Sequence, residues 1–253
     1  MIQSVQRAMT ILEHLGGDGH NTGITSVAHS VGLHKSTCFG LIYTLQKLGY
    51  AVQDDQGRYS LGLKSFELGS MYLNNLDIRA IAAPHLKVLA EKSKETVHLV
   101  LREGTHAVYI DKIEGPRAMN ISSRIGQEVS FSCTGVGKAI LAFMTKEEQD
   151  VIMGRPMPKH TKYTITTKEK LQACIDMIRK TGFSYDNQEI EIGLCCLAVP
   201  LFGYDGKVVG GLSISGPDIR LTKNRKQELM PELLKAMTGI SQRLGYTGPE
   251  LGK

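Results

Sequence analysis

Hydrophobic residues recur at steps of three and four along residues 36–48, which is the spacing of one face of an α-helix. The residues of this apolar face are Cys38, Leu41, Ile42, Leu45 and Leu48. A shorter helical pattern precedes it at residues 24–30, and a turn at residues 31–33 separates the two. Thr25 is the expected N-cap of the shorter helix, because its hydroxyl can accept a hydrogen bond from an amide of the first turn.

The opposite face of the longer helix and its flanks combine small, polar, aromatic and basic side chains. These residues are Ser36, Thr37, Phe39, Gly40, Tyr43 and Lys47. A helix with one buried face and one such face is suited to the major groove of DNA. The alternative is an ordinary corner between two helices, in which Ser36 and Thr37 only cap the helix.

The flanking segments extend this helix pair to a winged helix-turn-helix. A helix capped by Ser4 precedes the pair. Its expected apolar face consists of Val5, Ala8, Met9, Leu12 and Leu15. Alternating residues at 50–53 and 58–61 surround a glycine turn, which predicts a β-hairpin as the wing. Phosphates repel the acidic tip at Asp54 and Asp55, so Arg58 is the only backbone contact expected from this hairpin.

Helical patterns continue at residues 64–76 and 78–93. The first has too many apolar residues for a lone surface helix, so we expect it to pack on a partner chain. Pro84 predicts a kink or a new start in the second.

The remaining chain predicts an α+β domain built on an antiparallel sheet. Hairpin strands are expected at residues 96–102 and 107–113, a third strand at 121–125, and two apolar strands at 194–202 and 207–215. Capping boxes are expected at Thr145 and Thr166, each with a glutamate three residues later. The second of these helices is expected to end at Gly182, and a final apolar helical pattern ends at Gly245.

Composition limits the possible settings and partners of the chain. A 42% hydrophobic content in 253 residues is enough for real cores, and a net charge of +5 permits a polyanionic partner. Residues 1–64 are nearly neutral, with five cations against four acids, so DNA binding would depend on well-placed contacts and dimerisation. The five cysteines have no paired spacing, and the longest apolar run is far below the ~20 residues of a membrane helix. We expect a cytoplasmic protein with no membrane partner.

Gly135 and Gly137, followed by Lys138, are similar to part of a nucleotide-binding phosphate loop. The nucleotide motif requires glycine where this chain has Ser132, and serine or threonine where it has Ala139. That reading is excluded. What remains is a helix N-terminus whose free amides can bind a carboxylate.

No catalytic or metal-binding constellation is predicted. Cys196 has no histidine placed beside it by spacing. The histidines, His98 and His106 among them, are scattered without ligand spacing, and single histidines in strands are more often structural. No metal and no cofactor are therefore expected.

Several motifs in this order resemble the IclR family of bacterial transcription regulators. They are SVQRAMTIL at residues 4–12, LHKST at 33–37, GVGKAILA at 135–142, DNQE at 186–189, GLCCLAVP at 193–200 and GLSISGP at 211–217. Within the family, KETVHL, YIDKI, SRIG and LKSFELG look most like the regulators of 2-keto-3-deoxygluconate and related sugar-acid catabolism.

The resemblance implies a winged helix-turn-helix at residues 1–64, a linker and dimerisation helix at 65–78, and a GAF-like effector domain at 79–253. It implies a homodimer or homotetramer that binds a palindromic double-stranded DNA operator, responds to a small organic acid, and acts more often as a repressor than as an activator. The residues expected at DNA are Thr25, Ser26, Lys35, Ser36, Thr37, Phe39, Gly40, Tyr43, Lys47 and Arg58.

The resemblance also implies an effector pocket. Its residues would be Gly135, Val136, Asp186, Leu194, Cys196, Ser213 and Ser215. Amides and serine hydroxyls would hold the carboxylate, and Asp186 would accept hydrogen bonds from sugar hydroxyls. The alternatives are ordinary alternation along an edge strand for the two serines and core packing for Cys196.

The chain departs from the family pattern at Gly40, where the recognition helix usually carries arginine, and in its acidic wing. Our hypothesis is that Gly40 permits a close approach to DNA, and the alternative is a tolerated loss with weaker affinity. The expected function is transcriptional regulation, mainly repression, of a sugar-acid catabolic operon. Two alternatives stay open: an enzyme with a GAF-like catalytic domain, and a winged-helix module that binds protein.

Overall fold

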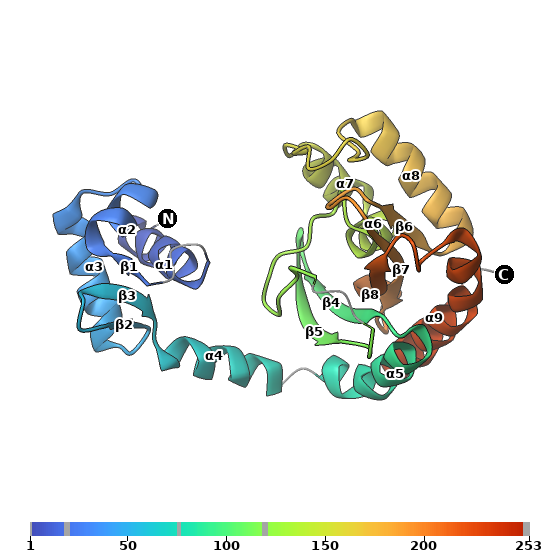
Figure 1. The fold of residues 1–253 in the computed structure, drawn as a ribbon, viewed down its shortest axis with the longest axis horizontal. Helices are drawn as coiled ribbons and strands as arrows, with labels where there is room; N and C mark the ends of the chain where they lie inside the picture. Colours follow the sequence, from blue (N-terminus) through green and yellow to red (C-terminus); the bar gives the residue numbers. More distant parts are fainter. Residues whose placement is uncertain (1, 18–20, 75–76, 118–120, 250–253) are drawn as a thin grey trace. The chain divides into compact units, whose positions relative to one another are not determined.

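The computed structural model describes residues 2–17, 21–74, 77–117 and 121–249 of the chain. The chain divides into two compact units, Met1–Leu76 and Asp77–Lys253 (Figure 1). No helix in the described residues is long and apolar enough to cross a membrane.

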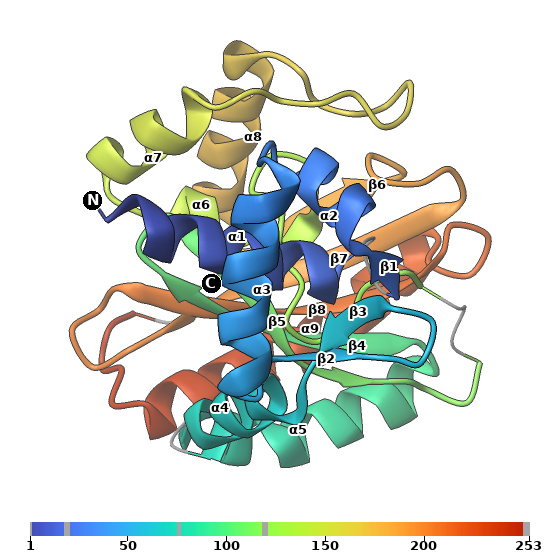
Figure 2. The ribbon, with the colours of Figure 1, turned by 90° about the vertical axis from the view of Figure 1, so that its left-hand side faces the viewer.

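The first unit is a winged helix-turn-helix, as predicted. Its elements are α1 (Gln3–Gly16), β1 (Thr22–Gly23), α2 (Ile24–Ser30), α3 (Lys35–Lys47), β2 (Ala51–Gln53), β3 (Arg58–Leu61) and α4 (Leu63–Asn74). The three strands pair antiparallel in the order β1-β3-β2, and β2 and β3 form the wing (Figure 2). Gly32 has φ +65° in the turn between α2 and α3, a conformation that glycine adopts without strain.

The core of this unit lies among α1, α2, α3 and the wing. Its buried residues are Ile11, Leu15, Val27, Ala28, Cys38, Ile42, Leu45, Ala51 and Tyr59. The predicted face of α3 is confirmed except at Leu48, which caps the helix and is exposed.

The predicted face of α1 is wrong in part. Ile11 is fully buried, whereas Val5 and Met9 are exposed. At 100° per residue, the apolar side chains of α1 cover an arc of roughly 160°. This arc is wider than the buried strip at Ile11 and Leu15, so periodicity alone does not select the buried side. The predicted caps are also wrong: the N-cap positions are Ile2 and Gly23, and Ser4 and Thr25 lie inside α1 and α2.

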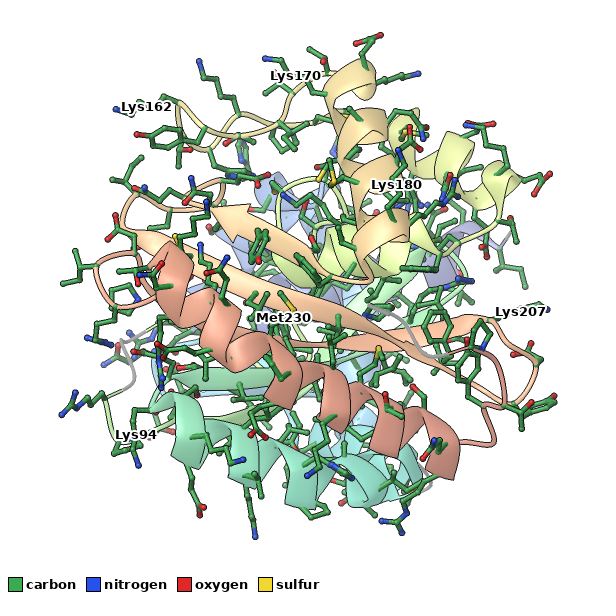
Figure 3. All side chains as sticks on the ribbon, turned by 90° about the vertical axis from the view of Figure 1, so that its right-hand side faces the viewer. Lys94, Lys162, Lys170, Lys180, Lys207 and Met230 are labelled. Carbon is green, nitrogen blue, oxygen red and sulfur yellow. The ribbon has the colours of Figure 1, made fainter. Side chains whose placement is uncertain are left out.

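The second unit is an antiparallel sheet with helices on both faces. Its elements are α5 (Asp77–Ser93), β4 (Thr96–Glu103), β5 (His106–Ile113), α6 (Gly135–Ala142), α7 (Lys146–Met153), α8 (Lys168–Thr181), β6 (Ser184–Asn187), β7 (Leu194–Phe202), β8 (Val208–Pro217) and α9 (Lys223–Arg243). The five strands have the order β5-β4-β8-β7-β6. α6 packs on β6, β7 and β8 and is contacted by α8. α5 and α9 lie side by side on the sheet (Figure 3).

Most of the predicted elements of this unit are confirmed. Thr145 makes the predicted capping box with Glu148, and Gly182 ends α8 with φ +80°. α5 is one helix that continues through Pro84.

Two predictions for this unit are wrong, and one alternative is excluded. Residues 121–125 form no strand, and the nearby Glu128 makes only an isolated bridge to Val108 of β5. The N-cap of α8 is Thr167, whose hydroxyl accepts from the Lys170 amide, so Thr166 makes no capping box. Ser213 and Ser215 lie on β8, which has a partner strand on both sides, so the edge-strand alternative is excluded.

Candidate functional site

The polar face of α3 is open to solvent. All the residues predicted at DNA from α2 and α3 are exposed: Thr25, Ser26, Lys35, Ser36, Thr37, Phe39, Gly40, Tyr43 and Lys47. The side chains of Phe39 and Tyr43 are 54% and 51% exposed, which is unusual for aromatic residues without a partner. The Lys47 ammonium lies 5.4 Å from the centre of the Tyr43 ring. The face therefore combines aromatic surface with a cation.

Ser36 and Thr37 do not cap α3. The N-cap position is His34, which makes no side-chain capping bond, and both hydroxyl residues lie within the helix. The capping alternative for these two residues is excluded. A Cβ added at Gly40 would meet nothing within 4 Å, so the surface at this residue is open.

Within the wing, the Arg58 guanidinium pairs with the Asp54 carboxylate. Arg58 Nε lies 2.9 Å from Asp54 Oδ2, and Asp54 Oδ1 accepts from the amides of Gln56 and Arg58, each at 2.9 Å. These hydrogen bonds, the Arg58 amide first, lower the pKa of Asp54. This pairing offsets the charge that Arg58 would present to a DNA phosphate.

The second unit contains a pocket with a cavity volume of about 280 Å³. All the predicted effector residues line it: Gly135, Val136, Asp186, Leu194, Cys196, Ser213 and Ser215. Strand register explains why they meet. Asp186 on β6 is the partner of Cys196 on β7, and Cys196 is the partner of Ser215 on β8, so their side chains share one face of the sheet.

Glycines let the N-terminus of α6 lie directly against this face. A Cβ added at Gly135 would lie 2.9 Å from Cys196 Sγ, and one at Gly137 would lie 2.1 Å from the Ser130 carbonyl oxygen. The Thr134 hydroxyl caps the helix by accepting from the Gly137 amide at 2.9 Å. No described residue accepts from the amides of Gly135 and Val136, so they can bind an anion at the pocket.

Burial controls the charge of the titratable groups in the pocket. It raises the pKa of Asp186 to about 7, although Asp186 Oδ1 accepts from the Glu189 amide at 2.7 Å. It raises the pKa of the Cys196 thiol to about 12, so this cysteine stays protonated and is no nucleophile.

His98 on β4 also lines the pocket, and sequence reasoning did not select it. Its Nε2 lies 2.8 Å from Ser123 Oγ and its Nδ1 lies 3.4 Å from Ser213 Oγ. Burial, with the charge of Lys112, lowers the pKa of His98 to about 3, so the ring is neutral. The sequence placed His98 in a predicted strand, but only the structure shows that His98 is the register partner of Ser213.

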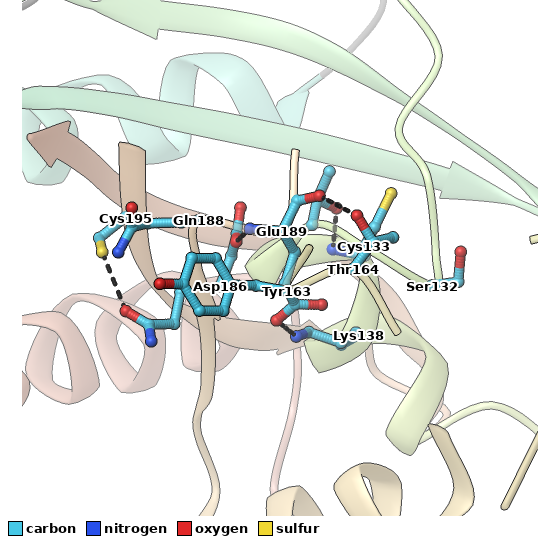
Figure 4. A network of polar contacts seen from close by, with 12 residues as sticks. Ser132, Cys133, Lys138, Tyr163, Thr164, Asp186, Gln188, Glu189 and Cys195 are labelled. Carbon is cyan, nitrogen blue, oxygen red and sulfur yellow. Dashed lines mark hydrogen bonds and ion pairs between the residues drawn. The ribbon is translucent and has the colours of Figure 1, made fainter. Parts of the chain in front are cut away.

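A buried ion pair connects α6 with the segment that follows β6, and these two elements supply Gly135, Val136 and Asp186 to the pocket. Lys138 of α6 donates to Glu189, which follows β6 (Figure 4). Thr164 Oγ1 donates to the Glu189 carbonyl oxygen at 2.6 Å. Burial raises the pKa of Glu189 against the opposing effect of Lys138. The glycine-led motif contains Lys138, but nothing in the sequence indicated its partner.

No three histidine, cysteine, aspartate or glutamate side chains in the described residues come together in a group that could hold a metal ion.

A winged helix-turn-helix with an exposed recognition helix, followed by a domain with a polar pocket, defines a DNA-binding protein with a separate ligand domain. Residues 4–55 match the IclR helix-turn-helix domain, and residues 70–242 match the bacterial transcriptional regulator IclR C-terminal domain. The chain belongs to the IclR family.

The relatives cover nearly the whole chain. It is 37% identical to the HTH-type transcriptional regulator KdgR of Escherichia coli strain K12, over 97% of this chain and 94% of that protein. The crystal structure of the Thermotoga maritima IclR shares 33% identity with a TM-score of 0.75, over 97% of this chain and 100% of that chain. An IclR homologue of Microbacterium hydrocarbonoxydans, complexed with 4-hydroxybenzoate, has the same fold, with a TM-score of 0.80 and 22% identity over 96% of this chain and 99% of that chain.

These findings confirm the predicted family, the α+β architecture and the predicted class of function. The chain is a DNA-binding transcriptional regulator with an effector domain. It is not an enzyme, since its relatives are transcriptional regulators. The enzyme and protein-interaction alternatives are set aside.

Proposed function

We propose that this regulator represses a sugar-acid catabolic operon in the cytoplasm and that a small organic acid controls it. The observation that carries the proposal is the position of the free amides of Gly135 and Val136 at a pocket that also contains Asp186, Cys196 and two serines. A helix N-terminus favours a carboxylate, and hydroxyl and thiol groups complete its hydrogen bonds. The homologue complexed with 4-hydroxybenzoate shares only its fold with this chain. In that protein, the fold accommodates an organic acid.

We infer that α3 enters the major groove. Ser36, Thr37, Phe39, Gly40 and Tyr43 would face bases and sugars. Lys35, Lys47, Thr25, Ser26 and, after it releases Asp54, Arg58 would contact phosphates. The exposure of this face supports the assignment. A near-neutral DNA-binding unit gains affinity from two half-sites, so the operator would be palindromic.

The two half-sites require a dimer or tetramer. We propose domain limits of 1–64 for the DNA-binding domain and 79–253 for the effector domain. Residues 65–78 would then form the linker and dimerisation helix. On α4, Leu63, Phe66, Leu68 and Met71 are exposed, which is consistent with burial against a second copy.

The regulatory mechanism would be a population shift. An acid that binds one arrangement of the oligomer better than another changes the spacing of the DNA-binding domains. Its effect on operator affinity cannot exceed its difference in affinity for the two arrangements.

Two measurements on the full-length protein test the proposal. A mobility-shift titration against the DNA upstream of its own gene, at two salt concentrations, should show specific and salt-dependent binding. A thermal-shift screen of sugar acids should identify one that stabilises the protein, by about 2.7 kcal/mol at 100 times its dissociation constant. The same acid should weaken or strengthen the DNA complex. Absence of stabilisation by any sugar acid would contradict the effector assignment.

A further inference from the structure

We propose that the Phe39 ring on α3 recognises the C5 methyl groups of thymines in the major groove. Sequence discrimination by this regulator would then depend on apolar contact with thymine more than on hydrogen bonds to purine edges. The inference rests on the proposed function, because it requires α3 to lie in the major groove of the operator.

Phe39 lies in the middle of the exposed face of α3. At 3.6 residues per turn, Ser36, Phe39, Tyr43 and Lys47 form one row along the helix. The Phe39 side chain is 54% exposed and is not part of the hydrophobic core formed by the described residues of this unit. Tyr43, one turn further along the row, is also exposed. Two neighbouring aromatic side chains outside the core form an apolar patch, which indicates contact with a partner.

The middle of this face lacks the side chains that make paired hydrogen bonds to purines. Arginine, lysine, asparagine and glutamine supply these contacts. Residues 36–43 contain none of the four. Lys35 and Lys47 are the first and last residues of α3, and the proposed function assigns them to phosphates. Gln46, the only glutamine of the helix, is half-buried in its last turn.

The hydroxyl groups of this face discriminate weakly between bases. A hydroxyl both donates and accepts, so Ser36, Thr37 and Tyr43 can bond either kind of base edge. The Thr44 hydroxyl donates to the Gly40 carbonyl oxygen at 3.0 Å, so its proton is used within the helix. Selectivity therefore falls to the apolar ring. Among the four bases, only thymine has a methyl group in the major groove, and phenylalanine is one of the side chains that contact it.

Gly40 leaves space for a base beside the ring. A Cβ added at this residue would meet nothing within 4 Å, so the helix surface next to Phe39 is open. Further along the same row, the Lys47 ammonium lies 5.4 Å from the centre of the Tyr43 ring and supplies a cation for the DNA backbone. This arrangement permits the close approach that van der Waals contact with a methyl group requires.

Replacement of thymine by uracil in the DNA tests the inference, because uracil pairs as thymine does and lacks only the methyl group. The probe is the DNA upstream of the regulator's own gene, amplified with either dTTP or dUTP. A mobility-shift titration of the full-length protein measures its affinity for each DNA. Burial of one methyl group contributes about fourfold in affinity. With one contact in each of two half-sites, we expect the wild type to bind the uracil DNA about 15-fold more weakly.

Two variants of Phe39 connect the effect to this ring. Phe39→Ala should bind the two DNAs with equal affinity, whereas Phe39→Leu should retain part of the difference because leucine keeps an apolar contact. The ring lies outside the core, so both variants should keep the unfolding temperature of the wild type. The matched control is Leu48→Ala. Leu48 is 58% exposed at the end of α3 and lies outside the row, so this variant should retain the wild-type ratio.

The outcomes separate the inference from the proposed function. Equal wild-type affinities for the two DNAs would overturn recognition of methyl groups and leave the proposed DNA binding intact. A thymine preference that persists in Phe39→Ala would overturn the role of this ring in the same way. Failure of the wild type to bind the thymine DNA would overturn the proposed function and this inference with it.

Discussion

Lys138 and Glu189 form an ion pair that is almost completely removed from water, with side chains 2% and 8% exposed. Removal of one partner leaves an uncompensated buried charge, so Lys138→Met should lower the free energy of unfolding by about 3 to 5 kcal/mol. Urea denaturation measures the change. The double variant Lys138→Met/Glu189→Leu should recover much of the loss, because apolar replacement of both charges removes the penalty.

The exposed pair Lys146–Asp150 is the control for this prediction. Its side chains are 61% and 59% exposed, and the ions lie 2.9 Å apart. Lys146→Met should cost less than about 1 kcal/mol, because solvent screens this pair. Equal losses for the two lysine variants would contradict a stabilising role specific to the buried pair.

Asp186 should make stability depend on pH. Its pKa is about 7 in the folded protein and near the ordinary 3.8 when unfolded. The folded state holds the proton more tightly, so the stability from this group is complete below the unfolded pKa and is lost as pH rises through 7. Relative to Asp186→Asn, the wild type should lose up to about 1.4 kcal/mol for each pH unit between these values.

Denaturation of the wild type and Asp186→Asn at pH 5, 6, 7 and 8 checks this difference. Asp205→Asn is a suitable control, since hydrogen bonds, the Lys207 amide first, lower the pKa of Asp205 and its contribution does not change in this range. Parallel stability curves for the wild type and Asp186→Asn would show that Asp186 is ionised throughout.

Lys35 should contribute one phosphate contact. It is exposed in the first turn of α3, where side chains and free amides meet the DNA backbone. Lys35→Ala should weaken binding to all DNA sequences and flatten the plot of log affinity against log salt by about one unit. Lys170→Ala, an exposed lysine of the other unit, controls for net charge. An unchanged slope would remove Lys35 from the phosphate contacts.

Asp54 should restrain DNA binding by the wing. Asp54→Asn keeps an oxygen that can accept from the amides of Gln56 and Arg58, but it removes the charge that binds the Arg58 side chain. We expect tighter DNA binding and a salt slope steeper by about one unit, because Arg58 becomes available to phosphate. Adding Arg58→Ala should reverse the gain. If Asp54→Asn alone has no effect, the wing does not contact DNA.

Gly40 should lower helix stability and favour close contact with DNA. Its surface is open, so Gly40→Ala should raise the free energy of unfolding by up to about 1 kcal/mol while weakening operator binding. Denaturation and mobility shift measure the two effects. If Gly40→Arg strengthened operator binding without changing base preference, close approach would not be the role of this glycine.

Sequence reasoning succeeded where one periodicity dominates. The apolar face of α3 and the apolar run at residues 207–215 predicted their elements, and the family motifs assembled pocket residues from three strands and one helix. It failed in α1, where the apolar face is wider than the buried strip and so did not single out Ile11. It also omitted β6, a strand of only four residues, SYDN, with no apolar pattern.

The sequence did not predict some of the site residues for a different reason. His98 and the Lys138–Glu189 pair depend on which strands and loops meet in space, and 51 positions separate the two charged partners. A single sequence contains no measure of that proximity. The register of β4 on β8 supplies it for His98.

The floor of the pocket belongs to the least adaptable part of the domain. β8 is paired on both sides, and a Cβ at Gly210 or Gly211 would lie 2.1 or 2.9 Å from the carbonyl oxygen of a neighbouring strand. Residues 121–123, Gln127, Glu128 and His160, in contrast, line the pocket from loops, where substitutions do little harm to a fold. A regulator built in this way can evolve a response to a new compound through its loop residues while its framework stays the same.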